Sequence, residues 1–149
     1  MKKITPALVK TFDKVIVLFL GFLGLATRCM PVAEYGTPHA DYHFRGDITN
    51  KGNKEPIENI QVKVYQDDTL LIGQSVTDSA GAYAMDIDLF PLNYQFRITA
   101  EDTDGAESGL FASKDTVVSA EISDLSGGDG WYEGEMEIRT DISLEEDLQ

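Results

Sequence analysis

The sequence predicts an all-β protein, a single antiparallel β-sandwich of about seven strands. Residues 41–144 contain a series of short runs in which apolar and polar side chains alternate, which is the pattern of half-buried strands. Clusters rich in Gly, Asp, Asn and Ser separate these runs, and no stretch after Met30 has a sustained helical period. Short strands with turn signals between them are typical of two antiparallel sheets packed face to face.

Length and charge limit the function classes. A chain of 149 residues has room for one ordinary domain with its own core. Its net charge is −14, and residues 1–29 hold five basic side chains and one acidic one, which leaves −18 for residues 30–149. A surface this acidic repels phosphate backbones, so we expect no nucleic-acid partner.

Residues 1–28 are expected to be a lipoprotein signal peptide, an amino-terminal signal helix that precedes the domain. A basic region ending at Lys14 is followed by an uncharged apolar run of 12 residues, Val15 to Ala26. This run has the length of a signal-peptide core and is shorter than the roughly 20 residues that a membrane-spanning helix needs. The alternative is a short uncleaved anchor, but Lys10 and Asp13 interrupt its extension. In either case the domain is exported.

Cys29 is the only cysteine, so no disulfide can form within the chain. Its position just after the apolar run resembles that of the lipidated cysteine of bacterial lipoproteins, where a signal peptidase cuts before Cys and the thiol carries a diacylglyceryl group. The resemblance implies that Cys29 is the lipidation site and that the partner there is a membrane. Arg28 departs from the small residues that usually precede the cleavage site. The alternative is an incidental cysteine beside a signal peptide.

Residues 29–40 are expected to be a tether, because Pro31, Gly36 and Pro38 interrupt any period. The first strand of the sandwich follows in residues 41–49, and its inward positions are Tyr42, Phe44, Gly46 and Ile48. A polar loop then leads to a second strand, whose inward positions are Ile60, Val62 and Val64.

Residues 70–77 and 82–88 are expected to form a hairpin at the centre of the sandwich. Asp78 and Gly81 supply the turn, since an Asp side chain can bond its own backbone and Gly can take φ > 0. After the turn Tyr83, Met85 and Ile87 share one face, and before it the apolar Val76 lies between two polar residues.

Three further strands complete the domain, at residues 93–101, 116–122 and 132–144. The last is the longest, and its inward face by period is Tyr132, Gly134, Met136, Ile138, Thr140, Ile142 and Leu144. Trp131 falls on the opposite, charged face. Residues 145–149 form an acidic tail that we expect to be frayed.

Three segments resemble the carboxypeptidase regulatory-like, transthyretin-like (prealbumin-like) domain over about residues 42–100. They are Arg45-Gly-Asp-Ile-Thr-Asn, Glu55-Pro-Ile-Glu-Asn-Ile-Gln-Val-Lys-Val and Val76-Thr-Asp-Ser-Ala-Gly-Ala-Tyr. A resemblance over most of the chain adds Cys29-Met-Pro-Val-Ala-Glu-Tyr-Gly-Thr-Pro, Asp102-Thr-Asp-Gly and Gly130-Trp-Tyr-Glu-Gly. Together these look like the lipoproteins of Bacteroidetes that are named for neighbouring radical SAM enzymes. The name records gene neighbourhood and no activity.

The acidic loop after the residue 93–101 strand is a candidate metal site. Asp102, Asp104 and Glu107 offer hard oxygen ligands at the alternate spacing of calcium loops, with Gly105 where the chain must turn. The alternative is a turn in which Asp102 or Asp104 caps its own backbone. Apart from this possible Ca²⁺, no cofactor is expected.

His39, Asp41 and His43 stand at alternate positions, so they would share one face of a strand and form a first-row metal site. The alternative is an exposed polar face.

No nucleophile motif, zinc-protease motif or phosphate loop is present, although composition alone does not exclude a carboxylate pair of the glycosidase type. We therefore expect no catalytic residues and no enzyme activity.

Trp131 heads the last strand beside a Gly-rich loop, where an exposed ring could contact a ligand or partner; alternatively it covers the open end of the sandwich.

We expect a non-enzymatic envelope lipoprotein, outer-membrane or periplasm-facing, that acts as a binding or accessory module for an unknown envelope protein and is linked to a radical SAM system. The alternatives are a secreted substrate of the neighbouring radical SAM enzyme and a polysaccharide-binding accessory module.

Overall fold

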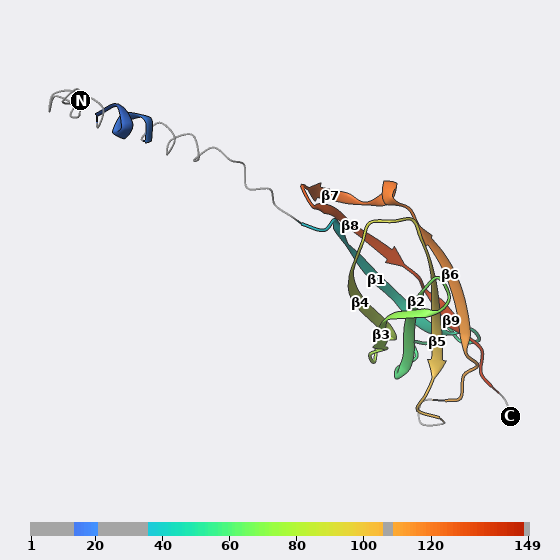
Figure 1. Ribbon diagram of the computed structural model, residues 1–149. Helices are drawn as coiled ribbons and strands as arrows, with labels where there is room; N and C mark the ends of the chain where they lie inside the picture. Colours follow the sequence, from blue (N-terminus) through green and yellow to red (C-terminus); the bar gives the residue numbers. More distant parts are fainter. Residues whose placement is uncertain (1–13, 21–35, 106–108, 148–149) are drawn as a thin grey trace, which may run out of the picture. The chain divides into compact units, whose positions relative to one another are not determined.

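The computed structural model describes residues 14–20, 36–105 and 109–147 (Figure 1). The chain divides into two compact units, Met1–Tyr35 and Gly36–Gln149. Residues 14–20 of the first unit are helical. Within the described ranges, no helix is both long and apolar enough to cross a membrane. Cys29 and most of the predicted signal peptide lie outside these ranges.

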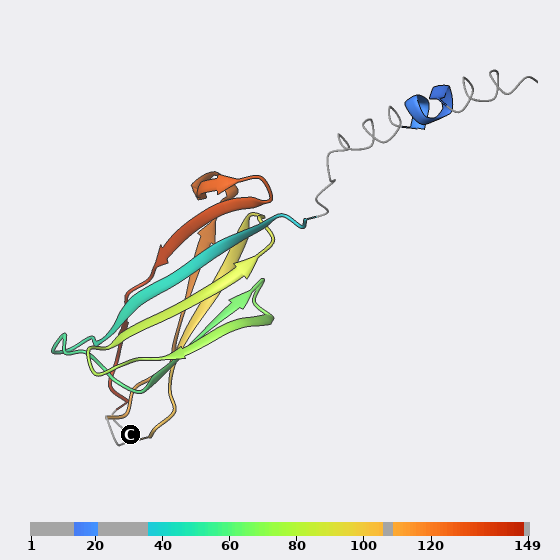
Figure 2. The ribbon, with the colours of Figure 1, turned by 90° about the vertical axis from the view of Figure 1, so that its left-hand side faces the viewer.

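The described residues of the second unit form a sandwich of two β-sheets (Figures 1 and 2). The first sheet contains β1 (His39–Asn50), β4 (Ala82–Leu89), β7 (Ser126–Asp129), β8 (Tyr132–Arg139) and β9 (Ile142–Leu144). The second contains β2 (Ile60–Gln66), β3 (Leu70–Val76), β5 (Tyr94–Asp102) and β6 (Lys114–Ala120). A 3-10 helix, η2 (Ile122–Asp124), follows β6.

The strand orders are β4-β1-β8-β7 and β3-β2-β5-β6, and β9 continues beside the end of β1. The pairs of β1 with β8 and with β9 are parallel, and the other pairs are antiparallel. The predicted all-β sandwich is confirmed, although the pairs of β1 with β8 and with β9 are parallel where antiparallel pairs were expected. Its described part has nine strands. The excess over the predicted seven arises because the short β7 is added and because Thr140 and Asp141 interrupt the last predicted strand.

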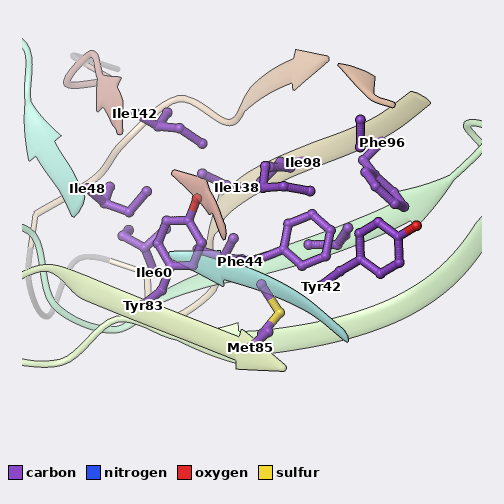
Figure 3. Close-up of a cluster of buried hydrophobic side chains, with 14 of the residues drawn as sticks. Tyr42, Phe44, Ile48, Ile60, Tyr83, Met85, Phe96, Ile98, Ile138 and Ile142 are labelled. Carbon is purple, nitrogen blue, oxygen red and sulfur yellow. The ribbon is translucent and has the colours of Figure 1, made fainter. Parts of the chain in front are cut away.

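The core lies between the sheets and contains the predicted inward residues of β1. Tyr42, Phe44 and Ile48 are fully buried. The ring of Phe44 meets that of Phe96 from β5 edge-on, with centroids 5.0 Å apart (Figure 3). Such aromatic pairs add about 0.5–1.5 kcal/mol beyond the burial of their area. β1 is therefore the strand around which the core is built.

The predicted hairpin of residues 70–88 is wrong in its pairing. β3 pairs with β2, whereas β4 pairs with β1 over eight register positions, so the two segments lie in different sheets. The turn itself has the predicted chemistry, because Asp78 Oδ1 accepts hydrogen bonds from the N–H groups of Ala80 and Ala82, and Gly81 has φ +73°. It is a corner between sheets, held where the Ile48 N–H donates to the Gly81 carbonyl at 2.8 Å.

The alternation of apolar and polar residues before the turn does not place Val76 in the core. Val76 pairs with the outward-facing Gln61 and is exposed, while Thr77 is buried. The Thr77 hydroxyl donates to the Ile57 carbonyl at 2.8 Å and accepts from the Ile60 N–H at 2.9 Å. These two bonds turn the polar residue inward, because a buried hydroxyl is stable where its hydrogen-bonding capacity is met.

Residues 145–147 of the acidic tail are attached to the sandwich, contrary to the expected fraying. The Ala112 N–H donates to the Glu145 carbonyl at 2.9 Å, and the Asp147 N–H donates to the Leu110 carbonyl at 2.8 Å. Glu146 accepts a bond of 2.6 Å from the Asn50 side chain. β1 also begins two residues earlier than the predicted domain start at residue 41.

Candidate functional site

The outer face of the first sheet carries a concentrated group of charged side chains. Register places the outward positions of β4, β1 and β8 side by side. We call this surface the acidic face, and its members are Asp41, His43, Arg45, Asp47, Asp86, Asp88, Glu135, Glu137 and Arg139. Six carboxylates thus stand against two guanidinium groups and one imidazole.

His43 stands at the centre of the acidic face and bridges its two flanking strands. Its Nδ1 lies 2.7 Å from Asp86 Oδ1 on β4, and its Nε2 lies 3.2 Å from Glu135 Oε2 on β8. The hydrogen bonds to Asp86 and then to Glu135 raise the pKa of His43 above its ordinary value. The imidazole therefore takes up a proton more readily here than in water, and the resulting cation pairs with both carboxylates.

Arg45 holds the other side of Asp86. Its Nη2 donates to Asp86 Oδ1 at 2.5 Å, and its Nη1 donates to the carbonyls of Phe44 and Met85 at 2.9 Å each. The hydrogen bonds from His43 and then Arg45 lower the pKa of Asp86. The guanidinium lies along the seam between β1 and β4, so this part of the face is rigid.

The remaining carboxylates leave the face with surplus negative charge. Arg139 pairs with Asp47 at 2.5 Å and with Asp141 at 3.3 Å. Asp88 and Glu137 form no ion pair within the described ranges. The acidic face is therefore an exposed, hydrogen-bonded sheet surface whose charge is only partly neutralised.

His39, Asp41 and His43 form a polar outer face, which was the alternative to a metal site. The three residues do lie at alternate outward positions of β1. However, no group of three His, Cys, Asp or Glu side chains among the described residues is arranged to hold a metal ion. His39 instead packs beside the ring of Tyr132, with centroids 5.4 Å apart, and His43 is bonded to Asp86 and Glu135.

The two rings at the start of β8 also differ from expectation. Tyr132 was predicted to enter the core, but it pairs with His39 and lies on the outer face, half-buried. The cause is a bulge, in which a three-residue step of β8 from Tyr132 to Glu135 lies opposite the two-residue step of β1 from His39 to Asp41. Gly134 in this bulge has φ +108°, a conformation that favours glycine. Trp131 is 44% exposed, and its ring packs against Gly36.

The structure describes only part of the predicted calcium loop, since Glu107 lies outside the described residues. Asp102 Oδ2 accepts a hydrogen bond of 2.9 Å from the Phe111 N–H, so this carboxylate closes the loop across nine residues rather than by the local cap that the turn alternative describes. Its Oδ1 is buried and has no hydrogen-bond partner in the described part of the chain. Asp104 is half-buried and precedes Gly105, which has φ +74°. Calcium binding at this loop therefore stays a prediction.

A separate hollow lies at the end of the sandwich where residues 109–111 and 146–147 meet the loop after β1. Its volume is about 720 Å³, and Asn50, Glu55, Ile57, Phe111 and Glu146 line it. The polar groups here bond one another, as Asn50 does with Glu146. Sequence periodicity could not have indicated this hollow, because the attachment of the acidic tail forms one wall.

No protein-family model and no curated protein matches the sequence. Chlorocatechol 1,2-dioxygenase from Pseudomonas putida has a similar structure, with a TM-score of 0.50 and 13% identity over 95% of this chain and 90% of that chain. The 5-hydroxyisourate hydrolase of Klebsiella pneumoniae has a TM-score of 0.43 and 16% identity, over 68% of this chain and 90% of that chain. The Bacillus anthracis TIE protein has a TM-score of 0.49 and 9% identity over 72% of this chain.

This chain spans only 18% of the length of the TIE protein. At such identities the similarity concerns the fold alone, because one fold hosts many unrelated functions.

Proposed function

We propose that this protein is an exported, lipid-anchored binding module without catalytic activity, and that its acidic face is the surface that contacts a basic partner protein of the cell envelope. The observation that carries the proposal is the surplus of carboxylates over three adjacent strands of one sheet. Charge complementarity of this kind steers association and selects partners.

The form of the acidic face favours a macromolecular partner over a small substrate. Its side chains project from paired strands, so their positions are held by the sheet ladder and need little ordering when a partner binds. His43 and Arg45 are both already bonded to Asp86. The carboxylates of Asp88 and Glu137 are available for pairing with lysine or arginine side chains of a partner.

The binding test compares two charge-neutralised variants of equal net charge. Asp88→Asn with Glu137→Gln removes two negative charges from the acidic face, and Glu58→Gln with Asp129→Asn removes two elsewhere. Tagged proteins are cross-linked in native envelopes and the captured proteins are compared by mass spectrometry. We expect a specific basic protein to be lost with the first variant and kept with the second. Equal capture by both would refute the acidic face as the contact surface.

Anchoring has its own experiment. If Cys29 carries the lipid, Cys29→Ala releases the protein from membranes into the soluble fraction. If membrane association is unchanged in this variant, another anchor or a bound partner holds the chain. Metabolic labelling with a clickable fatty acid adds a direct readout, because the label is expected on the wild type and not on the variant.

The link to a radical SAM enzyme rests on the resemblance of the segments at Cys29, Asp102 and Gly130. An accessory module keeps its mass whether or not the neighbouring enzyme is present. A secreted substrate of that enzyme acquires a mass shift only in cells that contain it. Intact-mass measurement of the mature chain from the two strains therefore separates these two functions.

A further inference from the structure

The end of the sandwich where residue 36 enters carries a group of exposed apolar side chains, which we call the apolar end. Phe90 and Leu92 lie in the connection between β4 and β5, Ile122 lies in η2, and Trp131 precedes β8. Figures 1 and 2 both show this connection, η2 and the start of β8 at the end where β1 begins. The exposed fractions are 48% for Phe90, 47% for Leu92, 44% for Ile122 and 44% for Trp131.

Hydrogen bonds hold these segments together. The Ile122 N–H donates to the Asn93 side chain at 2.9 Å, which fixes η2 beside the β4–β5 connection. The Tyr94 hydroxyl donates to the Phe90 carbonyl at 2.7 Å, and the His39 N–H donates to the Trp131 carbonyl at 3.0 Å. The apolar side chains are thus presented on a formed surface.

Trp131 is positioned by Gly36. A Cβ built on Gly36 would lie 2.7 Å from Cγ of the indole, so the ring packs directly against the glycine backbone. One side of the ring is covered in this way, and much of the rest is open to solvent. A large apolar ring with a polar N–H suits the boundary between water and lipid, where tryptophan is enriched.

Tether length determines what this end can reach. Only residues 30–35 separate Cys29 from Gly36, and a peptide of that length spans at most about 25 Å when fully extended. If Cys29 is lipidated, as the proposed function requires, Gly36 and the apolar end are held close to the membrane surface. The acidic face begins beside this end, at Asp41 and Asp88, and extends away from it along β1 as far as Asp47.

We propose that the apolar end docks on the lipid surface, with Phe90, Leu92, Ile122 and Trp131 entering the interfacial region of the bilayer. This inference rests on the proposed lipid anchor and adds a second, non-covalent contact to it. The diacylglyceryl group carries two acyl chains and anchors the chain by itself, so the second contact serves mainly to fix how the sandwich lies on the lipid. It would orient the sandwich with the acidic face accessible to a partner.

The test uses Trp131 as its own probe, since it is the only tryptophan. Lipidated full-length mature protein is reconstituted in phosphatidylcholine vesicles with or without a lipid that carries a nitroxide quencher at the headgroup. We expect a blue shift of Trp131 emission and strong quenching by the shallow nitroxide. Acrylamide should quench Trp131 less in the vesicle-bound wild type than in the Cys29→Ala variant, which carries no lipid and is measured in detergent-free buffer.

Two variants with substitutions at exposed apolar positions provide the comparison. Phe90→Ser, Leu92→Ser and Ile122→Ser together should lose most of the blue shift and the nitroxide quenching. Val76→Ser with Val117→Ser, at exposed positions outside the apolar end, should retain both. Far-ultraviolet circular dichroism of each variant verifies that the sandwich is folded.

The outcomes separate this inference from the proposed function. Wild-type protein that sediments with vesicles but shows no blue shift or quenching overturns the docking of the apolar end and leaves the anchor intact. Wild-type protein that does not sediment refutes the anchor, and the docking with it. Quenching by soluble glycans without any lipid effect would assign Trp131 to sugar binding instead.

Discussion

The Tyr83 hydroxyl donates a hydrogen bond of 2.7 Å to the carbonyl of Thr140, and this bond joins β4 to the segment between β8 and β9. Gly46 of β1 lies between them. A Cβ at Gly46 would lie 2.0 Å from the Thr140 oxygen and 2.8 Å from Cε1 of Tyr83. Burial raises the pKa of Tyr83 to about 12, so the phenol remains a donor throughout the physiological pH range.

Substitution at this contact should destabilise the fold. Gly46→Ala forces backbone or ring to move, and overpacking of a core typically lowers the free energy of unfolding by about 1–3 kcal/mol. Tyr83→Phe removes only the donor and should lower it by about 1 kcal/mol. Urea unfolding measures the free energy of unfolding of both variants, and the outer-face variant Ala84→Ser serves as the control. Wild-type stability of Gly46→Ala would contradict the close approach.

The hydroxyl of Thr77 gives a second prediction. Thr77→Val keeps the shape but leaves the Ile60 N–H and the Ile57 carbonyl without their partner, so it should lower the free energy of unfolding by about 1–3 kcal/mol. Val76→Thr, at the exposed neighbouring position, should change it by less than about 0.5 kcal/mol. If the two variants lost equal stability, the assignment of inward and outward positions at the end of β3 would be wrong.

The charge pair of His43 and Asp86 predicts a pH dependence. Because the pKa of His43 is raised in the fold, the contribution of His43 to the stability of the fold is fully present below the ordinary histidine pKa of about 6.5. It is lost as pH rises through the raised pKa. The pKa of Asp86 is lowered in the fold. Its contribution to stability is therefore present above the ordinary aspartate pKa of about 3.9 and is lost as pH falls through the lowered value.

The difference in melting temperature between wild type and His43→Gln should therefore be largest at mildly acidic pH and should shrink as the solution becomes alkaline. Asp86→Asn should remove most of the pH dependence, because it removes the main cause of the raised pKa. Glu135 is the other carboxylate in contact with His43, so Glu135→Gln should have a smaller effect in the same direction. A difference that stays constant with pH would count against the pairing.

Calcium binding at Asp102, Asp104 and Glu107 predicts a metal-dependent stability. A cation that binds only the folded chain raises the melting temperature by mass action. Asp104→Asn with Glu107→Gln should abolish this rise while leaving the bond from the Phe111 N–H to Asp102 in place. An identical melting temperature in excess Ca²⁺ and in chelator would remove the calcium prediction.

Side-chain alternation is a local property of a strand, so the sequence alone determined the class of fold and much of the core. The inward phase of Tyr42, Phe44 and Ile48 and the turn at Asp78 and Gly81 follow from period and residue type. The outward positions of Asp41 and His43 were predictable for the same reason.

Strand partners and surface assemblies were decided by the tertiary structure. The hairpin pattern of residues 70–88 does not say whether its arms share a sheet, because long-range pairing of β2 and β1 competes for each arm. One bulged residue before Glu135 moved Tyr132 from the predicted core to the outer face. The carboxylates bonded to His43 stand 43 and 92 residues away along the chain, so only the strand order β4-β1-β8 brings the acidic face together.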